Sequence, residues 1–311
     1  MASQNELGRL RDLVSYFEGR KLRAKERLSA DIGHKWCFAL VGFNIEVEEF
    51  KMEDFAVIRS VIEPPGEVEL ARALKEKHLW SAVGRYSKDI KYELTISSEA
   101  AETAQFAFTL AWWITSAIRI RSQTDFLIPA VADHSWSTIA ALEDATCSIQ
   151  ILEDVPQARR IDTTRVIREE DLTWAIDNLT HFASLLEMPK FRLAVESLST
   201  HHFQSSERMM TAQLWSGIEA LFEIQSELRF RLSAVIASIL EPRGEQRIAQ
   251  YRLVKKLYDV RSKAVHGGAI DNKKLMAHIK ETRQILAALI CKFTEMEHVP
   301  NEVELDTYLF S

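Results

Sequence analysis

The chain has 311 residues, a length that favours two domains because single hydrophobic cores rarely grow beyond about 250 to 300 residues. Its residues are 47% hydrophobic and 27% charged, with only 10 glycines and 7 prolines, which excludes a disordered chain and a small disulfide-rich scaffold. The net charge of −6 at pH 7 excludes a surface that is basic all over and binds nucleic acid by bulk charge, but it leaves room for a local basic site.

The chain begins with an amphipathic pattern. Apolar residues at three- and four-residue steps over residues 7–17 predict a helix that packs on the segments after it. The next segment, GRKLRAKERL at residues 19–28, is strongly basic. It is either the exposed face of the same helix continued or a contact for nucleic acid.

Strand patterns dominate the next part of the chain. Alternating β-branched and aromatic residues predict strands within residues 35–62 and over residues 90–96, with a helical pattern over residues 67–83 between them. The segment CSIQIL predicts one more strand. We therefore expect an N-terminal domain of the α+β class.

The longest apolar stretch, residues 104–118, predicts a core helix, with Ser97 and Glu99 as its start signal. It is shorter than the roughly 20 residues that span a membrane, and Arg119 and Arg121 follow it. The N-terminus has no apolar segment behind a positive start, so we expect neither a secretion signal nor membrane association.

The cysteines also indicate the compartment. Cys37, Cys147 and Cys291 lie far apart without C-x-x-C spacing, which predicts neither a zinc site nor a disulfide framework. Free thiols of this kind are typical of a reducing cytoplasm, and we expect the protein there.

A proline and a run of charged residues without apolar periodicity place the domain boundary near residues 155–168. We therefore predict an α+β domain over residues 1–165 and an all-α domain over residues 166–311. Beyond Asp171 the sequence carries helical patterns only, and short loops between them predict a bundle of four or five antiparallel helices. The predicted helices cover residues 172–187, 191–222, 227–240, 245–266 and 271–296.

The segment LYDVRSKAVHGG ends one of these helices and carries Arg261 and His266. On a continuous helix, five residues correspond to about 500°, so the two side chains would point about 140° apart. Either His266 leaves the helix at the two glycines that follow, or a second chain completes the site. The spacing alone is weak, since Arg27 with His34 and Arg72 with His78 match it loosely.

An arginine and a histidine suit cleavage of RNA. Histidine titrates near neutral pH and moves a proton to or from the 2′-hydroxyl or the leaving oxygen, while the guanidinium binds the phosphate in two places. Residues 243–274 hold nine Lys and Arg against three Asp and Glu, which favours either a phosphate contact or a solvated face. In a purely structural alternative, Arg261 pairs with Asp259 or Glu219, and His266 caps the helix end.

Two blocks in this half resemble HEPN domains of the Apea-like subgroup: QLWSGIEALFE followed by ELRFRLSAVIASIL, and then LYDVRSKAVHGG. The resemblance covers about residues 170–297, whereas the N-terminal half resembles the regulatory part of Apea-like proteins only loosely. It implies a helical bundle that dimerises, with a composite cleft between the two copies. It also implies metal-independent RNA cleavage that leaves a 2′,3′-cyclic phosphate, with Arg261 and His266 as the catalytic residues and Ser262 as the small polar residue after the arginine.

The resemblance predicts an endoribonuclease that needs no cofactor or metal and acts as a bacterial anti-phage defence or toxin-type effector. Its predicted partners are RNA, a second copy of the chain, and a regulatory protein or phage-derived trigger sensed by the N-terminal domain. The alternative is a non-catalytic HEPN module that binds a nucleotide, RNA or a protein partner.

Several neighbours of the motif have predicted supporting roles. Glu219 lies beside an apolar stripe and needs a cationic partner, either Arg261, which makes it an orienting residue, or Arg229 or Arg231, which makes it structural. Predicted contacts to RNA come from Lys263, Tyr258 and Lys256, although a surface role fits each of them as well.

Two other groups of residues that contain histidine were considered as functional sites, and the sequence supports them less well. His201 and His202 fall within a predicted helix, where adjacent side chains project about 100° apart, so we expect packing or exposure rather than a shared metal ion. The consecutive residues Asp133, His134 and Ser135 do not form a hydrolytic triad. Trp136 comes directly after them and either lies in the core or stacks on a base.

Overall fold

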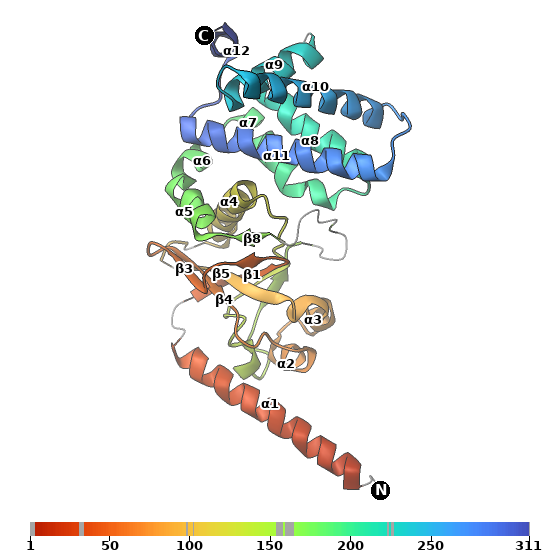
Figure 1. The fold of residues 1–311 in the computed structure, drawn as a ribbon. Coiled ribbons are helices and arrows are strands. Elements are labelled where there is room, and N and C mark those ends of the chain that lie inside the picture. Colours follow the sequence, from red (N-terminus) through yellow and green to blue (C-terminus); the bar gives the residue numbers. More distant parts are fainter. Residues whose placement is uncertain are drawn as a thin grey trace. The chain divides into compact units, whose positions relative to one another are not determined.

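The structure, a computed structural model, describes residues 4–30, 34–97, 99–101, 103–153, 158, 165–222, 224 and 227–310. Its contacts divide the chain into two compact units (Figure 1). The first consists of Met1–Ala111 and Phe126–Pro156, and the second of Trp112–Asp125 and Gln157–Ser311. The protein is α+β as predicted, with an antiparallel sheet in the first unit and a helical second unit.

The first unit is built on a six-stranded sheet in the order β3-β4-β5-β1-β6-β7. The strands of this unit are β1 (His34–Val41), β2 (Asn44–Ile45), β3 (Glu49–Met52), β4 (Ala56–Ser60), β5 (Ile90–Ser97), β6 (Ala130–Ala132) and β7 (Ile149–Ile151). At the centre of the sheet, Phe38 of β1 lies opposite Leu94 of β5, and both side chains are fully buried. The alternating patterns and the CSIQIL segment therefore predicted strands correctly.

The helices of the first unit are α1 (Gln4–Ala30), α2 (Glu67–Ala73), η1 (Lys77–Leu79), α3 (Trp80–Ser87), η2 (Ile139–Ala141) and the first part of α4 (Ala104–Ser122). The helical pattern over residues 67–83 thus forms two helices joined by a 3₁₀ turn. The start of α4 differs from the prediction, since Thr103 rather than Ser97 accepts from its first turn, at 3.3 Å from the amide of Phe106. Ser97 instead accepts from the amide of Ala100 in the preceding turn.

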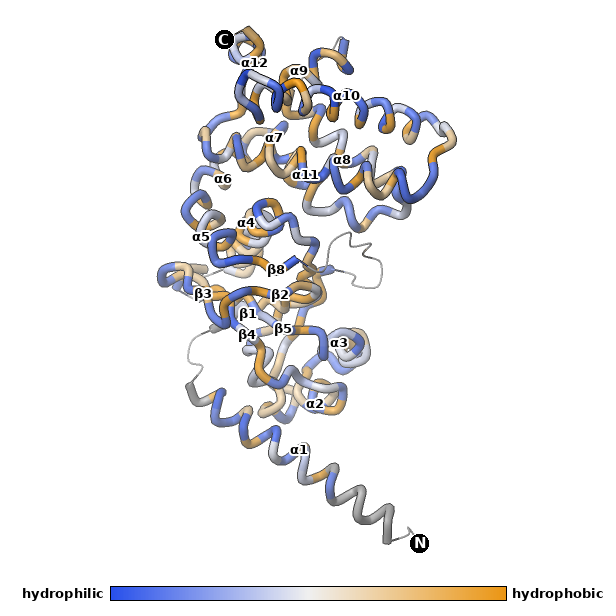
Figure 2. The backbone as a smooth tube through the Cα atoms, viewed as in Figure 1, coloured by the Kyte–Doolittle hydropathy of each residue, from blue (hydrophilic) through white to orange (hydrophobic). Residues whose placement is uncertain are grey.

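The basic run of α1 holds the helix on the unit. Arg20 donates to Glu69 at 2.9 Å, Arg27 pairs with Glu63 at 3.3 Å, and Ala24 between them is fully buried. Hydrophilic residues dominate the coloured part of α1 in Figure 2, as expected for a helix that contacts its unit along one narrow stripe. Ion pairing within the unit therefore accounts for the basic side chains that face it.

The second unit contains the remainder of α4 and a set of helices on α8 and α11 (Figure 1). Its elements are β8 (Val166–Ile167), α5 (Glu169–Asp177), α6 (Leu179–Leu185), α7 (Pro189–Thr200), η4 (His201–Phe203), α8 (Glu207–Phe222), α9 (Leu228–Leu240), α10 (Glu245–Val265), α11 (Asn272–Met296) and α12 (Glu302–Phe310). The single helix predicted over residues 191–222 was wrong, because η4 separates α7 from α8. The helix predicted over residues 172–187 is likewise divided at Asn178.

Close packing of α7 against α8 forms the core of this unit. A Cβ atom on Gly217 would lie 2.8 Å from Ser197 and 3.2 Å from the backbone of Ala194, so only glycine permits this approach. Leu214 and Ile218 on the predicted apolar face of α8 are fully buried.

The second unit also includes Trp112–Asp125, a segment from the first half of the chain. Within the unit, the guanidinium of Arg121 lies 5.4 Å from the ring centre of Trp174. Most of the predicted domain boundary falls outside the described residues, so its position stays a prediction. None of the helices described is both long and apolar enough to cross a membrane.

Candidate functional site

Arg261, in the last turns of α10, is held by Glu219 of α8. The Nη2 atom of Arg261 lies 2.9 Å from the carboxylate of Glu219, and both side chains are partly buried. Burial raises the pKa of Glu219, and the charge of Arg261 opposes this rise. Of the partners considered for Glu219, the structure therefore selects Arg261, since Arg229 and Arg231 pair with other carboxylates.

An aromatic residue of the same helix contacts Arg261 and is itself held by an aromatic residue of α8. The guanidinium carbon lies 5.5 Å from the ring centre of Tyr258, which packs edge-to-face on Trp215 of α8. The indole of Trp215 donates to Nε2 of His278 at 3.1 Å, and burial lowers the pKa of His278 to about 4. Sequence reasoning missed this support, although Trp215 lies one helical turn before Glu219.

His266 caps the C-terminal end of α10, directly after its last residue, Val265, and lies where the chain leaves the helix. Its amide still donates to the carbonyl of Ser262 at 3.1 Å, but Gly267 adopts a left-handed conformation with φ of +77°. The amide of Gly268 then returns to the carbonyl of Lys263 at 2.8 Å. The side chain of His266 is exposed at this turn. The double-glycine exit thus formed as expected, while completion of the site by a second chain stays a prediction.

Arg208 at the start of α8 fastens this turn to the bundle. Its Nη1 atom donates to the carbonyl of Ala264 at 2.6 Å and its Nη2 atom to the carbonyl of Gly268 at 2.7 Å. The carbonyl of Ala264 has no partner within α10 because it lies in the last turn, and Gly268 lies beyond the end of the helix. Nothing in the sequence indicated Arg208, since the two segments are more than fifty residues apart.

A cavity of about 270 Å³ opens beside the motif, between α10 and the start of α11. Three lysines line it, Lys256 and Lys263 from α10 and Lys274 from α11, together with Asp259 and Asp271. Two of the predicted RNA contacts, Lys256 and Lys263, therefore share one concave surface. Asp271 caps α11 as predicted, accepting from the amide of Lys274 at 3.2 Å.

The other residues considered in the first unit are engaged in structure. Ser135 donates to the fully buried carboxylate of Glu93 at 2.7 Å and makes no triad with His134. Trp136 is fully buried, and its indole donates to the carbonyl of Cys37 at 2.9 Å, so it does not stack on a base.

No known protein family, curated protein or solved structure matches this chain.

Proposed function

We propose that this protein is an endoribonuclease of the HEPN type, similar to the Apea-like subgroup, that cleaves RNA by attack of a 2′-hydroxyl on the adjacent phosphate. One observation carries the proposal: Arg261, paired with Glu219 at 2.9 Å, stands just before a turn that exposes His266. A guanidinium fixed in a packed helix and an exposed imidazole meet the two requirements of this chemistry, which are charge stabilisation and proton transfer.

The proposed reaction needs one group to take a proton and another to give one. The imidazole of His266 removes the proton of the 2′-hydroxyl, whose oxygen then bonds to phosphorus. The bond from phosphorus to the 5′-oxygen breaks, and a second histidine, from another copy of the chain, protonates this leaving oxygen. The products carry a 2′,3′-cyclic phosphate and a 5′-hydroxyl. Two copies of the motif in one cleft thus supply both the base and the acid.

Arg261 stabilises the charge that builds up on the phosphate. A guanidinium offers five N–H donors, and the contact to Glu219 uses Nη2, so other donors remain for phosphate oxygens. Glu219 acts through Arg261 as a positioning residue, and Ser262 contributes through its carbonyl, which accepts from the amide of His266. The lysine-lined cavity beside the turn suits the neighbouring phosphates of the RNA.

The surface around the turn also suits a second copy of the chain. Val265 next to His266 is 43% exposed, and Met209 next to Arg208 is 50% exposed. Arg208 contacts the end of α10, so these two apolar side chains belong to adjoining segments. Exposed apolar side chains of this kind are what a dimer contact would bury, so they support the proposal of a composite cleft.

A cleavage assay tests the function. Purified protein with single-stranded RNA and EDTA should yield products ending in a 2′,3′-cyclic phosphate. His266→Ala and Arg261→Ala should each abolish cleavage while remaining folded and dimeric, whereas Arg252→Ala, an exposed arginine on the same helix, should cleave normally. Cleavage that persists in both motif variants would overturn the assignment.

The second candidate is a non-catalytic module that binds RNA or a nucleotide. The lysine-lined cavity favours it, because binding there needs no contribution from His266. RNA binding without strand scission, weakened by Lys263→Glu but not by His266→Ala, would select this candidate. In either case we propose a cytoplasmic role in bacterial defence or as a toxin-type effector, with the first unit responding to a regulatory protein or phage-derived trigger.

A further inference from the structure

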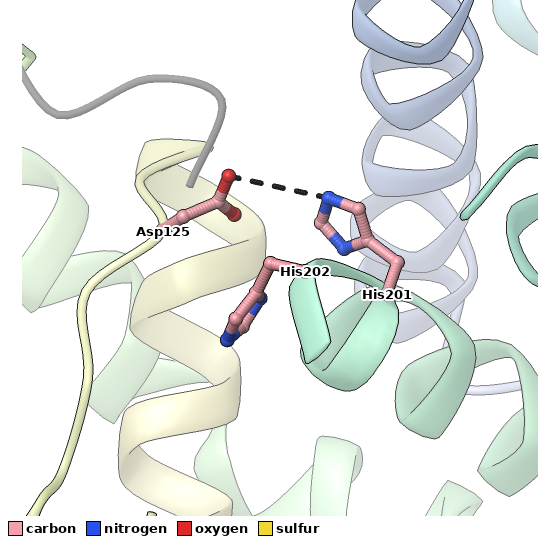
Figure 3. Close-up of side chains that lie close together, drawn as sticks. All are labelled: Asp125, His201 and His202. Carbon is pink, nitrogen blue, oxygen red and sulfur yellow. Dashed lines mark ion pairs between the residues drawn. The ribbon is translucent and has the colours of Figure 1, made fainter. Parts of the chain in front are cut away.

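A second cluster of chemically active side chains lies in the core of the helical unit. Asp125 follows the end of α4, and His201 and His202 form the η4 turn. Each offers one ligand atom, and these atoms lie within 4.8 Å of one another (Figure 3). All three side chains are almost fully buried. Both histidines are buried, as the packing alternative predicted, but they lie in the 3₁₀ turn η4 rather than in a continuous α-helix.

The hydrogen bond of His201 defines which of its two ring nitrogens carries a lone pair that could bind a metal ion. Its Nδ1 atom lies 2.6 Å from the carbonyl of Leu198, and a carbonyl only accepts, so Nδ1 carries the hydrogen. In the neutral ring, Nε2 therefore carries a lone pair. This atom is buried, has no hydrogen-bond partner in the described part of the chain, and points towards Asp125 (Figure 3).

The separation between His201 and Asp125 fits an ion between them. Nε2 of His201 lies 4.0 Å from Oδ2 of Asp125, which is too far for a hydrogen bond. A zinc-like ion bonds nitrogen and oxygen at about 2.0 to 2.2 Å, which places two tetrahedral ligands about 3.4 Å apart. A small closing movement of the side chains reaches that separation.

Arg283 of α11 orients the carboxylate. Its Nη2 atom forms an ion pair with Oδ1 of Asp125 at 2.9 Å, while Oδ2 of Asp125 lies 4.0 Å from Nε2 of His201. Metal-binding carboxylates and imidazoles are commonly held by contacts to groups outside the metal site; here Asp125 has an ion pair with Arg283, and His201 has a hydrogen bond to the carbonyl of Leu198. The arginine also offsets the charge of Asp125, so the site suits an ion that prefers imidazole over one that needs several carboxylates.

We propose that Asp125, His201 and His202 bind one divalent transition ion of the zinc class, with water as a further ligand. The ion ties the turn between α7 and α8 to the end of α4, and its role is structural. This inference is independent of the proposed function, because its ligands are not residues of the Arg261–His266 site.

The first unit contains a second group of potential metal ligands, which serves as a control for the proposed site. Asp133, His134 and Cys147 also group their ligand atoms, but Nδ1 of His134 already hydrogen-bonds to Oδ1 of Asp133 at 2.8 Å. A metal ion would have to break this contact. We therefore expect His134→Gln to leave metal uptake unchanged.

Metal analysis of the full chain tests the proposal. Wild-type protein expressed with added zinc should retain about one equivalent after desalting. The chelated protein should take up Co²⁺ with the visible absorption of a four-coordinate site that has nitrogen and oxygen ligands. His201→Gln and His202→Gln should lose both signals, and His134→Gln should keep both.

A measurement on the wild-type chain tests the proposal even if the variants fail to fold. Zinc at about a hundredfold excess over its Kd should raise the Tm of the chelated wild type by about 5 to 10 °C. A folded wild-type chain that takes up neither ion, or uptake that survives His201→Gln, would overturn the proposal. RNA cleavage measured with the chelated, folded protein separates this outcome from failure of the proposed function.

Discussion

The charges of Glu219 and Arg261 compensate each other inside the bundle. Replacing only one of the two residues should therefore affect the stability of the protein differently from replacing both. A carboxylate removed from water is costly unless a cation lies close to it, and Arg261 supplies that cation at 2.9 Å. Because burial alone would leave Glu219 harder to ionise, the free energy of the folded state depends on the arginine at neutral pH.

Arg261→Gln should destabilise the protein by about 1 to 2 kcal/mol at pH 7, as expected when a partly buried carboxylate loses its partner. Without the arginine, burial raises the pKa of Glu219 unopposed, so the folded state holds a proton more tightly than the unfolded chain. The loss of stability caused by Arg261→Gln should therefore become smaller as the pH falls towards 4.5, the ordinary pKa of a glutamate carboxyl. Urea unfolding at pH 7 and pH 4.5 measures this.

The double variant Glu219→Gln with Arg261→Gln is the control for this cycle. It leaves no carboxylate to compensate, so it should be more stable at pH 7 than Arg261→Gln alone. Equal stabilities of the two variants would contradict a compensating role for the arginine.

His278 should make the protein sensitive to mild acid. Burial lowers its pKa from 6.5 to about 4, so between these values the unfolded chain binds a proton and the folded chain does not. Stability is therefore lost as the pH falls through this range, by about 2 kcal/mol between pH 7 and pH 5. His278→Gln retains an acceptor for Trp215 without this titration and should reduce the difference. His78→Gln, at an exposed histidine, should leave the difference unchanged in the same urea experiments.

The end of α10 is fixed by contacts from three directions. Gly267 provides the left-handed turn, Gly268 donates back to the helix, and Arg208 binds two carbonyls from a separate helix. Helix ends usually fray because their last carbonyls lack partners within the helix. The position of His266 therefore depends on a tertiary contact as well as on the local glycines.

Arg208→Gln should loosen this turn. Losing two charged hydrogen bonds should cost about 1 to 3 kcal/mol and speed hydrogen exchange at the amides of His266 and Gly268. If the proposed function holds, cleavage should fall with little change in the KM for RNA, because the arginine positions the catalytic turn. Arg252→Gln on the exposed face of α10 is the matched control. Unchanged exchange in Arg208→Gln would show that the glycines alone fix the turn.

At the scale of the whole molecule, the helical unit is not a continuous piece of chain. Trp112–Asp125 belongs to it, and Asp125 pairs with Arg283 although both side chains are almost fully buried. The predicted all-α domain over residues 166–311 omits this segment. Removing one member of a buried ion pair typically costs about 3 to 5 kcal/mol, a large share of the stability of an ordinary domain.

A fragment of residues 166–311 should therefore be unfolded or should melt at least about 10 °C below the full chain. Joining residues 112–125 to residue 165 through a Gly/Ser linker should restore a cooperative transition. The connection is short, because Arg165 donates to Gln123 at 3.5 Å. Circular dichroism melts compare the three proteins, and a fragment as stable as the linked chain would contradict the role of the segment.

Much of the secondary structure was predictable because its signals are local. Asp271 capping α11 and the glycines ending α10 act within a few residues, and both formed as expected. The division of α7 from α8 was not predictable, since residues 201–206 contain neither glycine nor proline. The partner of Glu219 also stayed open, because several arginines lie within reach of α8.

Periodicity and residues adjacent in the chain were enough to predict the α+β class, most of the strands of the sheet and the turn that exposes His266. The pairing of Arg261 with Glu219, the contact of Arg208 with the turn, and the approach of Asp125 to His201 and His202 depend instead on the tertiary structure. Each of these contacts joins segments more than forty residues apart. Their formation depends on how the helices pack, which no local pattern specifies.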